Sequence, residues 1–284
     1  MAIFSNQATL SYNDTTVNSN IITGEVLEVL SAVKTAVLDE YSQCQNVTYV
    51  VSLVNSGPAA FTGPTLTDDL GAYNVGTATV TPLDYVQGSL RYYVNGTLQA
   101  TPAVTAGPPM TISGVTVPAG GNAILIYEAD VNRFAPLGAE DTITNTVTVT
   151  GSGLTAPVTA EETINAQTGP VLGITKSLSP TTVADNGQIT YTFVIQNTGN
   201  APALATDNVV LTDVFDPILS GLTVTLDGTL LSPVTDYTYD EATGTFATVP
   251  GVITVPAAAY TQDLTTGEWS VTPGTAVLTV TGTV

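Results

Sequence analysis

The chain has 284 residues and a mass of 29.1 kDa, with 4 basic against 24 acidic side chains. Its net charge of −20 argues against nucleic-acid binding and against membrane insertion, because binding nucleic acid or an anionic bilayer needs a basic surface. With no histidine in the sequence, His-based catalytic triads and His metal sites are excluded. The length suits two domains, and abundant Thr, Val, Tyr, Gly and Pro predict strands and turns rather than helices.

The first twelve residues alternate as a half-buried strand does. One face of this strand carries Phe4, Asn6, Ala8, Leu10 and Tyr12. A similar stretch at 143–150 aligns Asn145 with Asn6. The internal copy has a domain before it to complete, and the N-terminal copy has none. We therefore predict that residues 1–12 form a donor strand that completes a domain of a neighbouring subunit.

An internal repeat extends over the rest of the chain. A spacing of 142 positions links Lys34 with Lys176, Tyr49 with Tyr191, and Asn55 with Asn197. After a short insertion, Leu66-Thr67-Asp68 matches Leu211-Thr212-Asp213, and later Asn95-Gly96 matches Asp227-Gly228 as a two-residue hairpin turn. Alternating strands between Gly, Pro and Asn turns predict an antiparallel β-sandwich in each repeat.

The predicted organisation is all-β, with two tandem Ig-like sandwiches and an N-terminal donor strand. Its segments are the donor strand 1–12, a linker 13–31, a first sandwich 32–151, a linker 152–171, and a second sandwich 172–284 that lacks its closing strand. A sandwich without one strand exposes an apolar groove and an unpaired edge. Head-to-tail insertion of donor strands covers both, and such contacts generate an open filament.

Other interpretations remain open at this point. The N-terminal strand could fold back into its own second domain, or an extra hairpin at 260–269 could fill the gap. In function, the alternatives are a monomeric adhesin or stalk module with an unknown host or cell-surface ligand, and a calcium-dependent surface-layer protein. For calcium, the candidates are the acidic turns Asp68-Asp69 and Asp39-Glu40, although acidic turns are usually only solvated.

The matched motifs resemble a known family. Both repeats are similar to the conserved Ig-like repeat called domain of unknown function eleven. The similarity lies in Lys34, Tyr49, Val54-Asn55-Ser56-Gly57 and Leu66-Thr67-Asp68, and in their counterparts 142 or more positions later. The resemblance covers 32–151 and 172–284. It implies a stalk or surface-layer protein outside the cell, on a cell or spore surface, although no signal peptide or wall anchor is visible. Some Ig-like surface domains carry lysine–asparagine isopeptide bonds.

The chain's two lysines, Lys34 and Lys176, hold the same register in the two repeats, which suggests a specific role. An isopeptide bond needs a neutral amine, an asparagine carboxamide and a carboxylic acid in an apolar site, where burial favours the neutral forms. Lys34, Asp68 and Asn145 supply these groups in the first repeat. For the second repeat, Lys176 and Asp213 are present, and Asn6 of the next subunit would supply the asparagine. The alternative is a buried Lys–Asp ion pair hydrogen-bonded to Asn.

The remaining sequence features are weaker. Cys44 aligns with Asn186 in a turn, so we expect an exposed thiol that is either inert or joined to another chain. A single cysteine excludes an intrachain disulfide. Neither a Gly-rich phosphate loop nor another cofactor motif is visible, and no metal site is predicted. We therefore expect no external substrate, with Asp68 and Asp213 at most assisting autocatalytic cross-linking.

Overall fold

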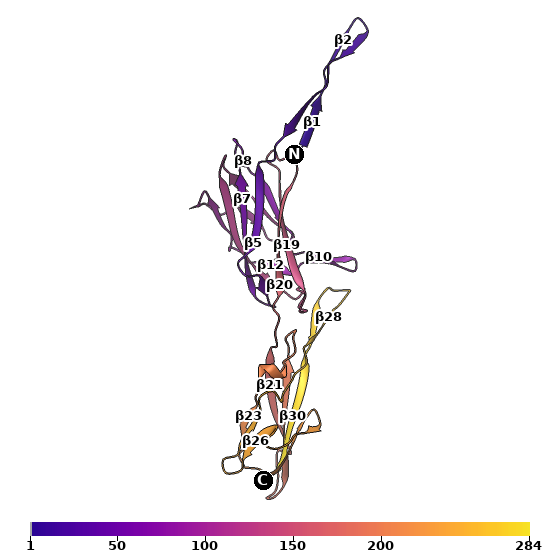
Figure 1. The fold of residues 1–284 in the computed structure, drawn as a ribbon. Helices are drawn as coiled ribbons and strands as arrows, with labels where there is room; N and C mark the ends of the chain where they lie inside the picture. The colour runs from indigo at the N-terminus through magenta and orange to yellow at the C-terminus, as the bar shows by residue number, and fades with distance from the viewer. Residues whose placement is uncertain (1) are drawn as a thin grey trace. The chain divides into compact units, whose positions relative to one another are not determined.

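The computed structural model describes residues 2–284, and nearly all of its regular structure is β-strand (Figure 1). One compact unit holds the residues up to Pro136 together with Thr142–Asn165, and the other holds Leu137–Asp141 and Ala166–Val284. A short 3-10 turn, η1 (Ala205–Asp207), interrupts the second unit. Among the described residues, no helix has the length and apolar character needed to span a bilayer. The predicted all-β class with tandem Ig-like sandwiches is confirmed.

The first domain is a sandwich of two antiparallel sheets. One sheet has the order β14 (Thr97–Leu98), β13 (Arg91–Val94), β18 (Asn122–Val131), β7 (Asn46–Asn55) and β5 (Leu30–Ala36), with β12 (Leu83–Tyr85) also on β18. The other has the order β15 (Ala103–Thr105), β16 (Met110–Ser113), β9 (Thr65–Asp68), β19 (Thr142–Thr150), β20 (Val158–Ala166) and β6 (Glu40–Tyr41). Short pairs β8 (Phe61–Thr62) with β17 (Thr116–Val117), and β10 (Tyr73–Val75) with β11 (Ala78–Val80), complete the domain.

The core of this domain follows from alternation along the long strands. In β7, the inward positions Val47, Tyr49, Val51 and Leu53 are buried, and the residues between them are more exposed. β19 does the same with Ile143, Asn145, Val147 and Val149. Period-2 alternation therefore builds the two facing layers of the sandwich, as the sequence predicts.

The second domain repeats the first sheet but only part of the second. One sheet has the order β21 (Leu172–Ser179), β22 (Gln188–Asn197), β30 (Gly274–Thr283), β24 (Ser220–Leu226) and β25 (Thr229–Leu230). The other has the order β23 (Thr212–Val214), β27 (Thr245–Thr248) and β26 (Tyr237–Asp240). Their core is more aromatic than that of the first domain, with Tyr191, Phe193, Phe215 and Phe246 buried.

Matching contacts verify the alignment of the repeats. Buried Asn55 accepts a hydrogen bond from the Gly57 amide at 2.9 Å and donates to the Ala59 carbonyl at 2.8 Å. Asn197 makes the same two bonds, from Gly199 at 2.9 Å and to Ala201 at 2.8 Å. Both side chains tie a turn that follows the central strand of their sheet.

The hairpin turns also match. Positive φ angles occur at Asn95-Gly96 (46° and 79°) and at Asp227-Gly228 (49° and 79°), as a type I′ turn requires. The two copies therefore share not only strand order but also local backbone geometry.

Residues 2–26 form a β-hairpin, which we call the N-terminal arm. β1 (Ala2–Asn6) pairs with β4 (Ile22–Val26), and β2 (Thr9–Tyr12) pairs with β3 (Thr15–Asn18). Within the described chain these strands pair only with one another (Figure 1). The arm therefore departs from the predicted linker 13–31, since that range contains two strands and the start of β5. Alternating Thr, Val and Ile residues in the return strand are the reason.

The predicted linker 152–171 also contains a strand. β20 pairs with β19 along its whole length, from Thr142 opposite Asn165 to Val149 opposite Val158. Only Ile164 and Ala166 of β20 are buried, because β20 lies near the sheet margin and most of its side chains face solvent. The first sandwich is thus closed by a hairpin, β19–β20, rather than by a single strand.

The extra hairpin predicted at 260–269 is present as β28 (Ala259–Gln262) and β29 (Trp269–Thr272). In the described residues it pairs with no third strand, and the free edge of β23 stays open. The interpretation that this hairpin fills the gap in the second domain is therefore wrong.

Candidate cross-link sites and the open sheet edge

The first domain contains a buried polar cluster between its two sheets. Lys34 comes from β5 and Asp68 from the end of β9, and the Lys34 Nζ atom donates to Asp68 Oδ2 at 2.7 Å. Both side chains are inward-facing on their strands, and their exposed fractions are 0% and 2%. The Leu70 amide donates to Asp68 Oδ1 at 3.1 Å, which fixes the carboxylate. The structure brings the predicted amine and acid into direct contact.

Asn145 of β19 completes this cluster through a tyrosine. The Tyr127 hydroxyl donates to Asp68 Oδ2 at 2.5 Å, and the Asn145 Nδ2 atom donates to the Tyr127 hydroxyl at 3.3 Å. Asn145 is fully buried, and its Oδ1 atom has no hydrogen-bond partner in the described part of the chain. All three predicted groups therefore share one site, and the amide oxygen is left without a donor.

Two tyrosines enclose the amine and were not predicted as site residues. The Lys34 Nζ atom lies 5.0 Å from the ring centre of Tyr49 and 5.9 Å from that of Tyr127. The two rings stack with centroids 5.7 Å apart. A polar tyrosine at an inward position of an alternating strand, as at Tyr127, is the sequence signal that could have identified them, because a buried hydroxyl needs a partner.

Burial controls the protonation chemistry of this cluster. Desolvation lowers the pKa of Lys34, and the neighbouring Asp68 charge only partly opposes it. The same desolvation raises the pKa values of Tyr49 and Tyr127, so both phenols stay protonated. Burial therefore favours the neutral, nucleophilic form of the Lys34 amine, in a site that also holds the buried Asn145 carboxamide.

The equivalent cluster in the second domain is less enclosed. Lys176 of β21 forms an ion pair with Asp213 of β23, and its Nζ atom lies 4.5 Å from the ring centre of Tyr191. The Phe193 and Phe215 rings complete the aromatic surround, at 5.4 and 5.6 Å. The exposed fraction of the Lys176 side chain is nevertheless 41%, against 0% for Lys34. An amine, an acid and an aromatic floor are present, and the cover is incomplete.

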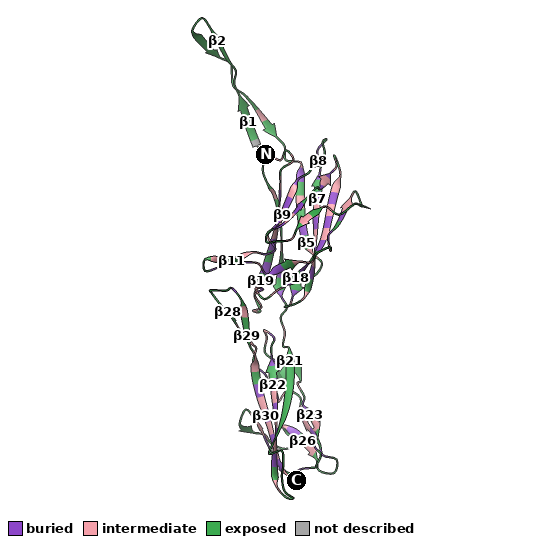
Figure 2. Ribbon diagram, turned by 180° about the vertical axis from the view of Figure 1, so that it is seen from behind, coloured by how far each residue is buried: buried purple, intermediate pink, exposed green. Residues whose placement is uncertain are grey.

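The cover that Lys176 lacks is missing at the edge of the sheet that β23 forms. In the first domain, β9 lies between β16 and β19; in the second, its counterpart β23 pairs with β27 alone. β21 is exposed along its whole length (Figure 2). Leu172 on its inward face is 40% exposed, whereas the equivalent Leu30 is 5% exposed. The second domain thus leaves apolar inward side chains of β21 exposed, and within the described chain β23 has an unpaired edge.

The predicted donor-strand residues are divided between two strands of the arm. Phe4 of β1 is opposite Gly24 and Asn6 opposite Ile22, and Leu10 of β2 is opposite Val17. Gln7 and Ala8 belong to neither strand, and the pairing register shifts by one residue there. Among the predicted donor residues, the large apolar side chains Phe4, Leu10 and Tyr12 are more than half exposed. The arm therefore carries uncovered apolar side chains on both β1 and β2.

The acidic turn at Asp68-Asp69 is occupied by protein donors. Asp69 Oδ1 accepts from the Gly71 amide at 2.9 Å and the Thr146 amide at 2.8 Å, next to the Asp68 that holds Lys34. In the part of the chain that the structure describes, no three acidic or cysteine side chains gather into a metal-binding group. Cys44 is exposed in its turn, as predicted, with a φ of 63° that matches 61° at Asn186.

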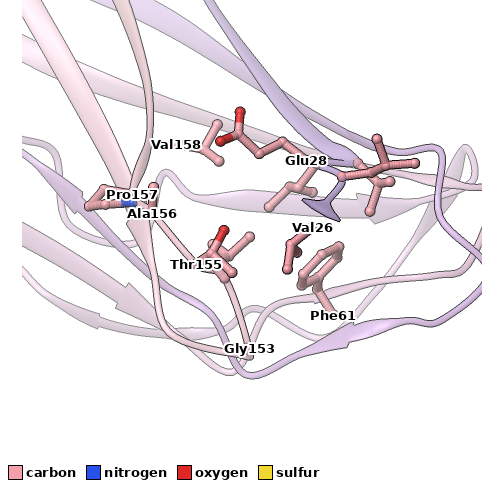
Figure 3. A pocket seen from close by; sticks show the side chains of 12 residues that line it. Val26, Glu28, Phe61, Gly153, Thr155, Ala156, Pro157 and Val158 are labelled. Atoms are coloured by element: carbon pink, nitrogen blue, oxygen red, sulfur yellow. The ribbon is translucent and has the colours of Figure 1, made fainter. Parts of the chain in front are cut away.

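A small pocket of about 80 Å³ lies where the arm joins the first domain (Figure 3). It is lined by Val26–Leu30, Phe61 and residues 153–158. Most of these side chains are apolar, and Glu28 is the ionisable group among them. The pocket holds no amine, thiol or paired acids, so it offers no catalytic constellation.

Comparisons with known proteins give only distant matches. No family model matches the sequence. No curated protein matches it either. Solved structures with a similar fold include BcpA, the major pilin subunit of Bacillus cereus (13% identity, TM-score 0.35, 96% of this chain and 73% of that one). Full-length major pilin RrgB from Streptococcus pneumoniae is similar at 14% identity and TM-score 0.36, over 88% of this chain and 42% of that one.

A further similar structure is the collagen-binding domain of a Staphylococcus aureus adhesin. It shares 11% identity at a TM-score of 0.31, over 47% of this chain and 96% of that one. Similarities this distant do not indicate function.

Proposed function

We propose that this chain is the structural subunit of a filament on a cell or spore surface. Each copy inserts β1 and β2 of its arm beside β23 in the second domain of a neighbouring copy. The observation that carries the proposal is the unequal environment of two equivalent strands, because β9 is covered by β19 whereas the edge of β23 is open. Such a contact joins different surfaces of identical subunits, and it propagates as an open filament where the rotation between copies does not close a ring.

The first domain supplies a template for the pairing. There, Val147 lies opposite Asp68 and Val149 opposite Leu66. Aligning Asn6 with Asn145 transfers this register to Ala8 opposite Asp213 and Leu10 opposite Leu211. In that register, Leu10 covers the groove and Asn6 reaches the Lys176 cluster. Burying each large apolar side chain of the arm contributes roughly 2 kcal/mol to association before ordering costs.

The same register would allow covalent lysine–asparagine bonds to form. The neutral Lys34 amine attacks Cγ of Asn145, the Cγ–Nδ2 bond breaks, and ammonia leaves. Asp68 accepts the proton that the amine loses and returns it to the departing nitrogen, so the acid is regenerated. Lys176, Asp213 and the Asn6 of a neighbouring copy would react in the same way. The first bond lies within a subunit and the second joins subunits.

Removing the arm tests the assembly mode. A chain that begins at residue 27 is expected to fold as a monomer with an open groove, because the arm belongs to neither core. Electron microscopy should then show no filaments. A synthetic peptide with the sequence of residues 3–12 should bind the shortened chain and should also cap growth of the full-length protein. Normal filaments from the shortened chain would show that assembly does not use the arm.

A further inference from the structure

Compared with the first domain, the second domain lacks counterparts of two strands, β19 and β20, rather than of one, in the residues that the structure describes. In the first domain, β19 and β20 together fill the space between β9 and β6, and the Asn165 amide of β20 donates to the Asp39 carbonyl at 2.8 Å. The counterpart of β6 in the second domain is Thr182-Val183, which belongs to no strand. Val183 is 36% exposed, whereas the equivalent Tyr41 is fully buried. Two strand positions, about 4.8 Å apart, are therefore vacant beside β23.

The arm has matching dimensions and a matching face. Its return strand places Val17 opposite Leu10 and Ile22 opposite Asn6, so each of the two shares a face with a predicted donor residue. Val17 and Ile22 are both exposed. The apolar stripe of the arm therefore crosses both of its strands.

Around β2 and β3, the opposite face of the arm is polar and internally bonded. The Thr9 hydroxyl donates to Asn18 Oδ1 at 3.0 Å, and the hydroxyls of Ser11 and Thr16 lie 3.2 Å apart. The Gln7 side chain donates to the Ser19 carbonyl at 2.8 Å. These bonds hold the two strands together on the side that would face solvent.

We infer that the donor is the whole hairpin, residues 2–26, which docks as a preformed unit between β23 and Thr182-Val183 of a second copy. This rests on the proposed function and adds the return strand β3–β4 to the interface. An isolated two-stranded hairpin is only marginally stable in water, so docking against a sheet would stabilise the paired strands that the arm already has. A single inserted strand would leave Val183 exposed and the second strand position empty, whereas the hairpin reproduces the β9–β19–β20–β6 order.

Three single substitutions in the full-length chain test this. Val17→Asp places a charge on the apolar face of the return strand, and Thr16→Asp places one on its polar face as the matched control. Leu10→Asp places a charge on the apolar face of the first strand. All three sites are exposed in the free chain, so each variant should fold. The readouts are the sedimented fraction and filaments in negative-stain images.

We expect Val17→Asp and Leu10→Asp both to abolish sedimentation, because each buries an unpaired charge in the docked state, and Thr16→Asp to assemble normally. If Val17→Asp assembles like Thr16→Asp while Leu10→Asp does not, only the first strand is inserted and the hairpin inference is overturned. If Leu10→Asp assembles as well, the proposed function itself fails. Equal loss from all three variants would also contradict the assigned faces.

Discussion

Wild-type filaments are expected to survive boiling in detergent and reductant as a ladder of covalent multimers. The reason is that, in the proposed docking, Asn6 of one copy would meet Lys176 and Asp213 of the next. Asn6→Ala or Lys176→Ala should abolish the ladder completely on denaturing gels, while filaments still form before denaturation. Asp213→Ala should also abolish it, because the carboxylate that carries the proton is gone.

Two controls separate this bond from other links. Asn145→Ala removes only the intrachain reaction, so its ladder should persist. Cys44→Ser should leave the ladder unchanged, which excludes a disulfide between exposed thiols as its source. Filaments that dissolve wholly to monomers in boiling detergent would contradict interchain cross-linking and would leave the Lys176 cluster as an ion pair.

The contrast between the two lysines explains why free subunits would remain unlinked. Lys34 is enclosed by its own chain, whereas 41% of the Lys176 side chain is exposed in the free second domain. Burial of a lysine favours the neutral amine, which is the nucleophilic form. Docking of the arm would supply both the missing carboxamide and the missing cover. The interchain reaction is therefore expected to follow docking rather than to precede it.

The sequence was sufficient to predict the strands whose inward residues are apolar. Val47, Val51 and Leu53 mark β7 clearly, and the spacing of 142 positions placed Lys34 and Lys176 in one register. Alternation also placed Phe4, Asn6 and Leu10 on one face. These signals are local, so one sequence carries them.

The hairpin β19–β20 and the N-terminal arm were harder to predict, because the second strand of each carries few inward apolar residues. β20 buries only Ile164 and Ala166, and β3 contributes Val17 among polar neighbours. Such segments resemble Thr-rich linkers, and only sheet pairing identifies them as strands. The contact of Tyr127 with Asp68 and Asn145 depends on three strands far apart in sequence, which no local pattern encodes.

Blocking the intrachain bond should lower the stability of the first domain strongly. Lys34 and Asn145 are 111 positions apart. By analogy with a disulfide that closes a loop of this length, the cross-link would contribute about 4–5 kcal/mol. Asn145→Ala and Lys34→Met should therefore lower the melting temperature by about 10 °C or more, measured by calorimetry.

Mass spectrometry and a double mutant make this last test specific. The wild-type chain should weigh less than its sequence by one ammonia, and both single variants should have the full mass of their sequences. Because each variant removes the same bond, the double variant Asn145→Ala/Lys34→Met should be much less destabilised than the sum of the two single effects. Asn122→Ala, which alters an asparagine outside the cluster, should keep the ammonia loss. A wild-type chain with no ammonia loss would mean that Lys34, Asp68 and Asn145 form a non-covalent polar cluster, stabilised by the Lys34–Asp68 ion pair and the hydrogen bonds at Tyr127.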